Sequence, residues 1–546
     1  MAESCLLRSN SSATGAPSIK HAMAQNLSDA AQVLSPTGQS DDSYFSTERL
    51  KTGLGARAAR GGAVTIASQG FKFFAGLGTT MVLGRLLTPG DYGLIGMVAV
   101  VTGFVSMFKD LGLSAATVQH EEITSAQVST LFWVNVVLSV GVGFVTLALA
   151  PAVAWFYGRP QLTAVTAVYG LGFLFGGLTV QHEALLHRQM RFLAQAVCEI
   201  TALLVTIGVT IALAWRGWGY WSLVVGHVTT SFVYMLCIWT VCRWRPGRPR
   251  RVSTVISMLR FGGNLTGFGV VNFFARNLDN MLIGRVWGSQ QLGLYAKAYQ
   301  LLTLPIDQIN APITTVAVPT LSRLNDSPER YRRTYLRIIE KIAVLTMPGI
   351  ALLIGTSDLV VRIVLGPQWT EAGRIFAALG VAALIQPIAN TTGWLFISQA
   401  RTNDMFRYGL VASTIIVAAI ISGLPWGALG VATVYALVWV TIITPMLFYW
   451  VGRKGPVRPR DFYVTVAPAF CAALGVLAAL YLFRHSGLVS NPVAALLVSV
   501  GIAAAVALLV LYLIPAGRRA LMDFGTVAAI MLRKREGDLG TDPVQG

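Results

Sequence analysis

The sequence predicts an all-α membrane protein of about 14 transmembrane helices, and three observations lead to this prediction. Hydrophobic residues make up 54% of the 546 residues and charged residues only 12%, whereas soluble domains contain about 25% charged residues. Apolar windows of about 18 to 25 residues recur between residues 62 and 515, each long enough to cross a hydrocarbon layer of about 30 Å. Basic residues are also distributed unequally between alternate loops.

The apolar windows give fourteen predicted helices joined by short loops. Their expected ranges are 62–86, 92–109, 127–156, 161–181, 193–215, 219–242, 260–286, 291–322, 336–364, 371–398, 405–424, 427–452, 462–483 and 491–515. With a cytoplasmic amino terminus, 30 of the 42 Lys and Arg residues fall on the inner side and 8 on the outer side. Both termini are therefore expected in the cytoplasm, because basic residues accumulate in cytoplasmic loops.

The two ends of the chain are polar. Residues 1–60 are rich in Ser, Ala, Gln and Asp and have no long apolar run, so they are expected to form a disordered cytoplasmic tail. Residues 516–546 are expected to form a cytoplasmic amphipathic tail, in which the segment from Arg518 to Lys534 suits a helix on the membrane surface.

An internal repeat relates the first predicted helix to the seventh. A shift of 200 residues aligns segment 73–94 with segment 273–294 and gives eight identities, among them Gly84 with Gly284 and Gly93 with Gly293. Six helices separate the two copies, so the halves are expected to be related by an axis along the membrane normal. The expected domains are an N-lobe (61–243), a C-lobe (244–453) and two further helices (454–515).

Lys72 lies near the middle of the first predicted helix, about 15 Å from either end, which is too deep for its side chain to reach the interface. Gln69 lies on the same helical face. Lys72 has no acidic residue within its own helix, and the nearest acids by depth are Glu199 and Asp307. The sequence therefore predicts a cation that faces protein or water.

The seventh predicted helix carries a matching polar face, with Asn272 in the position that the repeat pairs with Lys72. Arg276 and Asp279 are three residues apart, so they are expected either to neutralise each other or to serve as ligand and orienting partner. Further candidates for the lining of a central cavity are Lys297, Gln386 and Asn390.

A cavity that contains an uncompensated cation favours an anionic guest, and Lys and Arg both suit phosphate. Hydroxyl and amide groups beside the cation suit sugars. We therefore predict that Lys72, Arg276, Asp279, Asn272, Gln69, Lys297, Gln386 and Asn390 contact an amphiphilic substrate whose tail stays in the bilayer.

Several other classes of protein are disfavoured. The basic loops lie where membrane topology already requires them, so the net charge of +18 does not indicate nucleic acid. The five cysteines are scattered and the histidines lack ligand spacing, so neither disulfides, a metal nor a cofactor is expected. The predicted outer loops are too short for a catalytic domain, and there is no nucleotide-binding G-x-x-x-x-G-K-[ST] motif, so an enzyme is not expected.

Several segments resemble the bacterial polysaccharide flippases of the Wzx type, in the multidrug/oligosaccharidyl-lipid/polysaccharide exporter superfamily. They include VLGRLLTPGDYGLIGM (82–97), FKDLGLSAATVQ (108–119), ALLHRQMRF (184–192), RNLDNMLIGRVWGSQQLGLYAKAYQL (276–301) and VAVPTLSRL (316–324). The resemblance implies a two-lobed fold that exports undecaprenyl-diphosphate-linked oligosaccharide across the bacterial inner membrane by alternating access. It also implies a polysaccharide polymerase and chain-length proteins as partners.

Three alternatives remain open at this stage. A cation-coupled multidrug antiporter of the same superfamily would depend on intramembrane carboxylates, of which the first lobe offers few. A lipid II flippase would share the fourteen-helix plan, and a membrane enzyme of polysaccharide assembly would alter chain length rather than transport.

Overall fold

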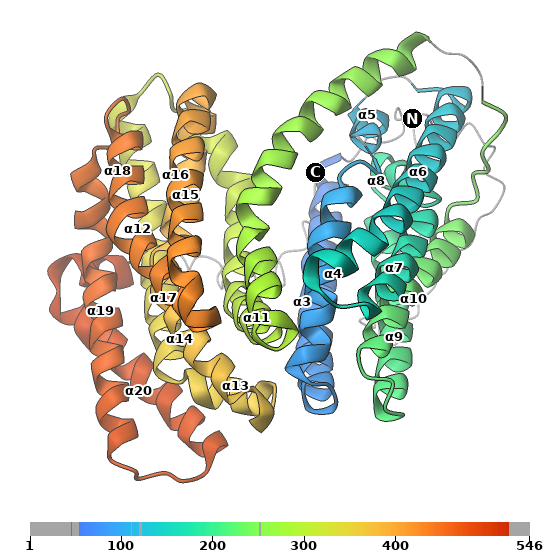
Figure 1. The fold of residues 1–546 in the computed structure, drawn as a ribbon. Coiled ribbons are helices and arrows are strands. Elements are labelled where there is room, and N and C mark those ends of the chain that lie inside the picture. The colour runs from blue at the N-terminus through green and yellow to red at the C-terminus, as the bar shows by residue number, and fades with distance from the viewer. Residues whose placement is uncertain (1–44, 46–53, 111, 120–122, 250–252, 523–546) are drawn as a thin grey trace, which may run out of the picture.

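In a computed structural model, the described residues are 45, 54–110, 112–119, 123–249 and 253–522, and they form helices without any strand. Figure 1 shows two groups of helices side by side, which we call the N-terminal bundle (α3–α10) and the C-terminal bundle (α11–α20). The bundles meet where α3, α4 and the sharp turn of α11 come together, and the first part of α11 continues from there across the N-terminal bundle, whereas α16 and α18 lie far from α6. The predicted tails, residues 1–60 and 516–546, lie largely outside the described residues.

The N-terminal bundle contains eight helices among the described residues. These are α3 (Leu54–Leu86), α4 (Pro89–Ser106), α5 (Leu113–Gln119), α6 (Ser125–Tyr157), α7 (Gln161–Gly177), α8 (Val180–Arg188), α9 (Phe192–Trp215) and α10 (Tyr220–Val241). The helix α3 begins at Leu54 rather than near residue 62. The segment LGARAAR before the apolar run is rich in strong helix formers, which a search for hydrophobicity alone overlooks.

The C-terminal bundle begins with the longest helical segment. Its helices are α11 (Ser253–Ser322), α12 (Pro328–Gly355), α13 (Ser357–Val364), α14 (Thr370–Ala383), α15 (Gln386–Ser398), α16 (Thr402–Gly423), α17 (Gly427–Val438), α18 (Thr444–Gly452), α19 (Pro459–His485) and α20 (Pro492–Leu513). The segment α11 is in fact two helices, because Gly288 adopts a non-helical conformation with φ of 79°. A positive φ of this kind is accessible to glycine at little cost.

The helix α4 begins at a well-defined signal. The hydroxyl of Thr88 accepts from the backbone N–H of Asp91 while the Asp91 carboxylate accepts from the backbone N–H of Thr88, and Pro89 occupies the first turn. This reciprocal arrangement satisfies two backbone donors at the helix start. It fixes the short turn after α3 and so fixes the position of α4 against α11.

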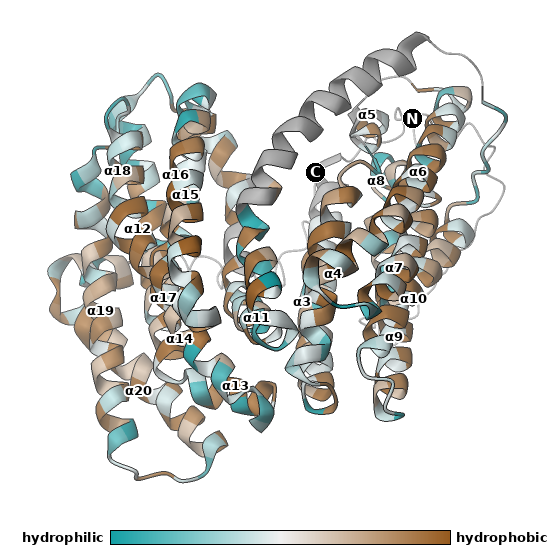
Figure 2. Cartoon of the chain, viewed as in Figure 1, coloured by the Kyte–Doolittle hydropathy of each residue, from teal (hydrophilic) through white to brown (hydrophobic). Residues whose placement is uncertain are grey.

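The fold agrees with the predicted class. Ten helical stretches among the described residues are long and apolar enough to cross a membrane, and Figure 2 shows hydrophobic residues along the middle of most helices with hydrophilic residues near their ends. The all-α membrane fold is therefore confirmed. The count of fourteen spans and the boundaries of the three predicted domains stay predictions.

Small residues allow the two bundles to approach each other. On α4, a Cβ at Gly96 would lie 3.3 Å from the Leu292 side chain, and a Cβ at Gly103 would lie 3.0 Å from the ring of Phe273. Met97 lies between them on the same helix and is fully buried. Glycines at such positions let membrane helices pack closely without a hydrophobic driving force.

Candidate functional site

The end at which the bundles meet, which we call the closed end, is built from pairs of residues related by the 200-residue repeat. A Cβ at Gly93 would lie only 1.7 Å from the backbone oxygen of Ser289, and a Cβ at Gly293 would lie 1.8 Å from the backbone oxygen of Pro89. Each glycine therefore packs directly on the backbone at the start of the other bundle's equivalent helix. Reciprocal contacts of this kind are what a two-fold axis between the bundles produces.

A second reciprocal pair lies beside the first. A Cβ at Gly84 would lie 3.0 Å from the backbone of Leu365, and a Cβ at Gly284 would lie 3.0 Å from the ring of Tyr157. The arginines that follow these glycines also cross between the bundles. Arg85 donates to the backbone oxygen of Ile363 at 2.7 Å, and the guanidinium of Arg285 lies 5.8 Å from the ring centre of Phe156.

Polar side chains complete the closed end. The amide of Gln368 donates to the backbone oxygens of Gly84 (2.6 Å) and Leu87 (2.8 Å), and the indole N–H of Trp369 donates to Gly84 at 2.8 Å. These bonds satisfy backbone carbonyls at the end of α3, which have no partner within the helix. The turn between α13 and α14, which contains Gln368 and Trp369, thus holds the two bundles together.

Lys297 lies at the same contact between the bundles. Its Nζ atom is 4.1 Å from the ring centre of Tyr92 on α4 and donates to Gln300 Oε1 at 2.9 Å. The Tyr92 ring also packs edge-on against Trp369, with 5.5 Å between ring centres. The predicted site residue Lys297 therefore belongs to the closed end, where it contacts an aromatic face.

Lys72 is not the uncompensated cation that the sequence suggested. Its Nζ atom donates to Glu199 Oε2 on α9 at 2.6 Å, and the two side chains remain 26% and 29% exposed. The sequence named Glu199 as one of two acids at the same depth but left Lys72 uncompensated, because the rotation of α9 that turns Glu199 toward α3 does not follow from the first helix alone. The partial exposure of both side chains shows that the ion pair is not enclosed in dry packing.

The Lys72–Glu199 pair continues into a polar network within the N-terminal bundle. Gln195 donates to Glu199 Oε1 at 2.9 Å and to Glu183 Oε1 at 3.3 Å. His187 Nε2 lies 3.8 Å from the same Glu183 carboxylate. Sequence reasoning missed both Glu183 and Gln195. Gln195 could have been found, because it lies four residues before Glu199 on the same helix face, whereas Glu183 lies on a separate helix, α8.

On α11, Asp279 has partners other than the predicted Arg276. Its carboxylate accepts from the Tyr295 hydroxyl at 2.8 Å and from the backbone N–H of Asn280, also at 2.8 Å. Arg276 is exposed, and within the described part of the chain no ion pair links it to Asp279. Of the two expected roles, mutual neutralisation of Arg276 and Asp279 is therefore wrong, because the turn at Gly288 brings the Tyr295 hydroxyl to Asp279. The ligand role of Arg276 stays a prediction.

The remaining predicted site residues lie near Lys72 on α3 or on helices that include or pack against α11. Gln69 is exposed one turn before Lys72 on α3. Gln386 is half-buried and Asn390 exposed at the start of α15, which packs against α11. Asn272 falls within α11, but its side chain lies outside the described part of the structure. The side chain of Asp307, the other acid considered for Lys72, lies outside it as well.

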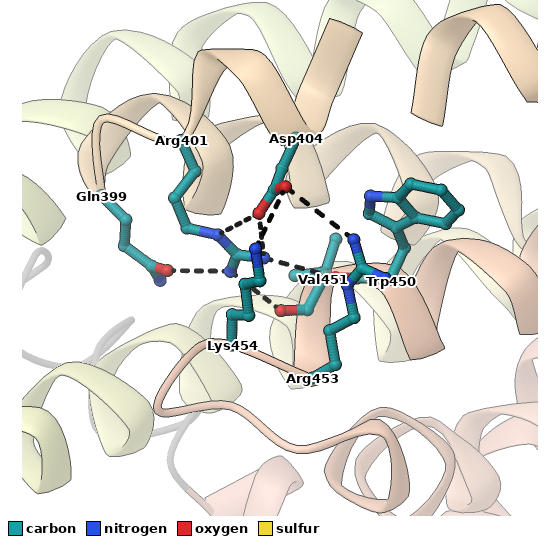
Figure 3. Close-up of polar contacts among 7 residues, drawn as sticks. All are labelled: Gln399, Arg401, Asp404, Trp450, Val451, Arg453 and Lys454. Atoms are coloured by element: carbon teal, nitrogen blue, oxygen red, sulfur yellow. Dashed lines mark hydrogen bonds and ion pairs between the residues drawn. The ribbon is translucent and has the colours of Figure 1, made fainter. Parts of the chain in front are cut away.

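One further charged cluster lies where α15 ends, α16 begins and α18 ends (Figure 3). Asp404 lies 3.2 Å from Arg401, 3.8 Å from Arg453 and 3.5 Å from Lys454, so one carboxylate faces three cations. Arg401 also donates to the backbone oxygens of Val451 and Trp450. The cluster ties the α15–α16 turn to the end of α18, and sequence reasoning counted its cations only as topology signals.

The described residues contain no group of His, Cys, Asp and Glu that could hold a metal ion. The chemistry that the arrangement does offer is recognition by charge and hydrogen bonding. Partly or fully exposed polar groups, among them Lys72 on α3 and Arg276 on α11, are available for such recognition. These features define a multi-pass helical membrane protein built from two related halves.

The chain belongs to a family described as polysaccharide biosynthesis protein, whose model matches residues 82–374. The family resemblance predicted from the sequence is therefore confirmed.

Curated relatives span most of the chain. The lipopolysaccharide biosynthesis protein WzxC of Escherichia coli is 26% identical, over 69% of this chain and 77% of that protein. The teichuronic acid biosynthesis protein TuaB of Bacillus subtilis is also 26% identical, over 68% and 76%. The succinoglycan biosynthesis transport protein ExoT of Rhizobium meliloti is 23% identical, over 77% and 84%.

Two solved structures share the fold. The lipid II flippase MurJ in an inward closed conformation has a TM-score of 0.66 at 13% identity and covers 82% of this chain and 97% of its own. An inward-facing multidrug resistance transporter of the MATE family has a TM-score of 0.53 at 13% identity, with 75% and 95% covered.

Proposed function

We propose that this protein is a flippase that carries an undecaprenyl-diphosphate-linked oligosaccharide from the cytoplasmic to the periplasmic leaflet of the bacterial inner membrane. The observation that carries the proposal is the Lys72–Glu199 pair, which lies near the middle of α3 with about a quarter of each side chain exposed. It belongs to one of two bundles that are joined at the closed end by close glycine contacts and hydrogen bonds. The family and the names of its relatives support polysaccharide as the cargo.

In this proposal the closed end faces the periplasm and both termini face the cytoplasm. The bundles then alternate between the present arrangement and one in which the Gly93–Ser289 and Gly293–Pro89 contacts separate. Backbone contacts of this kind suit an interface that opens and closes as a unit, because they are either fully formed or fully lost.

Substrate binding at mid-depth requires a change of partner for Lys72. A diphosphate that reaches the pair competes with Glu199 for the ammonium group, and Arg276 offers a second cation on α11 that has no ion-pair partner among the described residues. Asn280 adds a buried Oδ1 atom without a described hydrogen-bond partner, which can accept from a sugar hydroxyl. The lipid tail remains in the bilayer throughout, so the protein transports and does not catalyse a bond change.

The proposal is tested by deleting the gene and following the lipid-linked repeat units. We expect them to accumulate in the cytoplasmic leaflet and surface polysaccharide to disappear, with both defects reversed by the wild-type gene. Normal surface polysaccharide in the deletion strain would contradict the proposal. A polymerase and chain-length proteins are the expected partners in the same assembly process.

One observation favours a second candidate, a cation-coupled multidrug antiporter. The structure brings Glu183 and Glu199 together through Gln195 in the N-terminal bundle, whereas the sequence suggested few carboxylates there. Intramembrane carboxylates suit cationic drugs and coupling ions. Drug resistance that depends on Glu183 and Glu199, together with unaltered polysaccharide in the deletion strain, would favour the antiporter.

A further inference from the structure

A basic pocket lies on the C-terminal bundle, away from the proposed transport path. It has a volume of about 400 Å³ and is lined by side chains of α12, α19 and the segment that follows α20. Figure 1 shows α19 on the side of the C-terminal bundle that is remote from the N-terminal bundle. The lining residues are Arg332, Arg333, Arg337, Arg519, Glu329 and Glu340, with Leu336, Val464, Thr465 and Ala516.

The arginines of this pocket do not all have the same role. Arg332 donates to both carboxylate oxygens of Asp461 on α19, at 2.7 and 2.6 Å, and so holds α12 against α19. Arg333, Arg337 and Arg519 are exposed, and within the described residues no acidic partner lies in ion-pair distance of any of them. Three guanidinium groups are therefore free to bind an anion at a fixed concave surface.

The chemistry of three free guanidinium groups favours a phosphate. The planar fork of arginine matches two phosphate oxygens at once, and a cavity of this volume accommodates a small headgroup. The two glutamates that line the pocket leave it with an excess of positive charge, since Arg332 is already neutralised by Asp461.

The surroundings of the pocket distinguish a lipid from a soluble phosphate. Arg333 and Arg337 lie on one face of α12, four residues apart. Leu345 follows about two turns beyond Arg337, partly round the helix, and is 57% exposed. Val464, which lines the pocket on α19, is 61% exposed. The surface thus changes from cationic to apolar within two helical turns, as the boundary between a headgroup and its acyl chains requires.

We propose that this pocket binds the phosphate headgroup of an anionic phospholipid from the leaflet that surrounds it. The site is separate from the proposed transport path, and its occupancy stabilises the contact between α12, α19 and the end of α20. Basic pockets between transmembrane helices are suited to anionic headgroups for the same electrostatic reasons.

The test uses the full-length protein in detergent, with lipid retention measured by native mass spectrometry. Phosphatidylglycerol should be retained in preference to phosphatidylcholine, and the variant R333Q/R337Q/R519Q should retain about tenfold less phosphatidylglycerol, since bidentate charge-assisted bonds are lost. A matched control, R323Q/R330Q/R407Q, removes three exposed arginines that do not line the pocket. It should retain phosphatidylglycerol as the wild type does.

Two results would overturn the proposal. Equal loss of phosphatidylglycerol in the pocket variant and the control variant would show that only the total charge matters. Displacement of phosphatidylglycerol by an equal concentration of glycerol phosphate would show that the pocket recognises a soluble phosphate ester and that the acyl chains contribute nothing. Both measurements are independent of transport, so they do not depend on the proposed function.

Discussion

Gly93 of α4 lies so close to Ser289 that a Cβ atom on the glycine would stand 1.7 Å from the Ser289 backbone oxygen. The repeat gives the same relationship in the other direction, because a Cβ atom on Gly293 would stand 1.8 Å from the Pro89 backbone oxygen. No side chain can be accommodated at either distance without a shift of backbone. The closed end therefore depends on the absence of two side chains.

The first prediction concerns Gly93→Ala. The added methyl group should disfavour the closed end by about 1 to 3 kcal/mol, as overpacking does elsewhere, which shifts the equilibrium between closed and open forms by about 5-fold to 150-fold. Leu365 lies at this end, packs on Gly84 of the other bundle and is 0% exposed. A Leu365→Cys probe, in a protein otherwise free of cysteine, should react faster with a membrane-impermeant thiol reagent once Gly93→Ala is added.

The matched control is Gly349→Ala on α12, where a Cβ atom would meet nothing within 4 Å. It should leave labelling of the Leu365→Cys probe unchanged. If Gly93→Ala labels no faster than this control, the glycine contact does not hold the bundles together.

The second prediction separates a role of Lys72 in substrate binding from its role in neutralising Glu199. Lys72→Ala should abolish transport and also leave Glu199 without its partner, whereas Lys72→Ala/Glu199→Ala removes both charges, a change that is often close to neutral for stability. We expect the double variant to recover the thermal unfolding midpoint of the wild type but to remain inactive in transport. Normal transport by the double variant would mean that Lys72 serves only to neutralise Glu199.

The third prediction concerns Arg276, which is exposed on α11. Arg276→Ala should be expressed and inserted normally, because the side chain has no described ion-pair partner to lose, yet transport should fall sharply. Arg216→Ala, at the exposed end of α9, is the control and should transport normally. Equal transport by the two variants would remove Arg276 from the candidate site.

The fourth prediction concerns the ring of Tyr92, which lies 4.1 Å from Lys297 Nζ. Tyr92→Phe keeps the aromatic face and should leave the closed end intact. Tyr92→Leu should weaken it, since a contact between an ammonium group and an aromatic ring contributes about 0.5 to 2 kcal/mol. Labelling of the Leu365→Cys probe reports both effects, and equal labelling in the two variants would show that the ring is not required.

Much of the architecture could be predicted from the sequence, because hydrophobicity and glycine are local signals. The apolar windows located most of the helices and predicted a break between residues 286 and 291, which is where the structure has Gly288 in a non-helical conformation. The repeat that paired Gly93 with Gly293 also pointed to the residues that now form the closed end. The start of α3 was missed because its first turns are helical without being apolar.

The partners of the charged residues could not be predicted in the same way. The pairing of Lys72 with Glu199 depends on how α9 is rotated against α3, and a single sequence does not specify that rotation. Likewise, the spacing of Arg276 and Asp279 suggested an ion pair within one turn, but the hairpin at Gly288 brings the Tyr295 hydroxyl to Asp279 instead. Tertiary packing thus decided between local alternatives that the sequence left open.

The central claim is tested most directly by reconstituting the purified protein in vesicles with a labelled undecaprenyl-diphosphate-linked oligosaccharide. The accessibility of the sugar in each leaflet can then be followed over time. We predict that the wild-type protein moves the labelled lipid between leaflets and that Lys72→Ala does not, although both insert equally. Movement at the same rate in vesicles with wild-type protein, with Lys72→Ala and without protein would contradict the account.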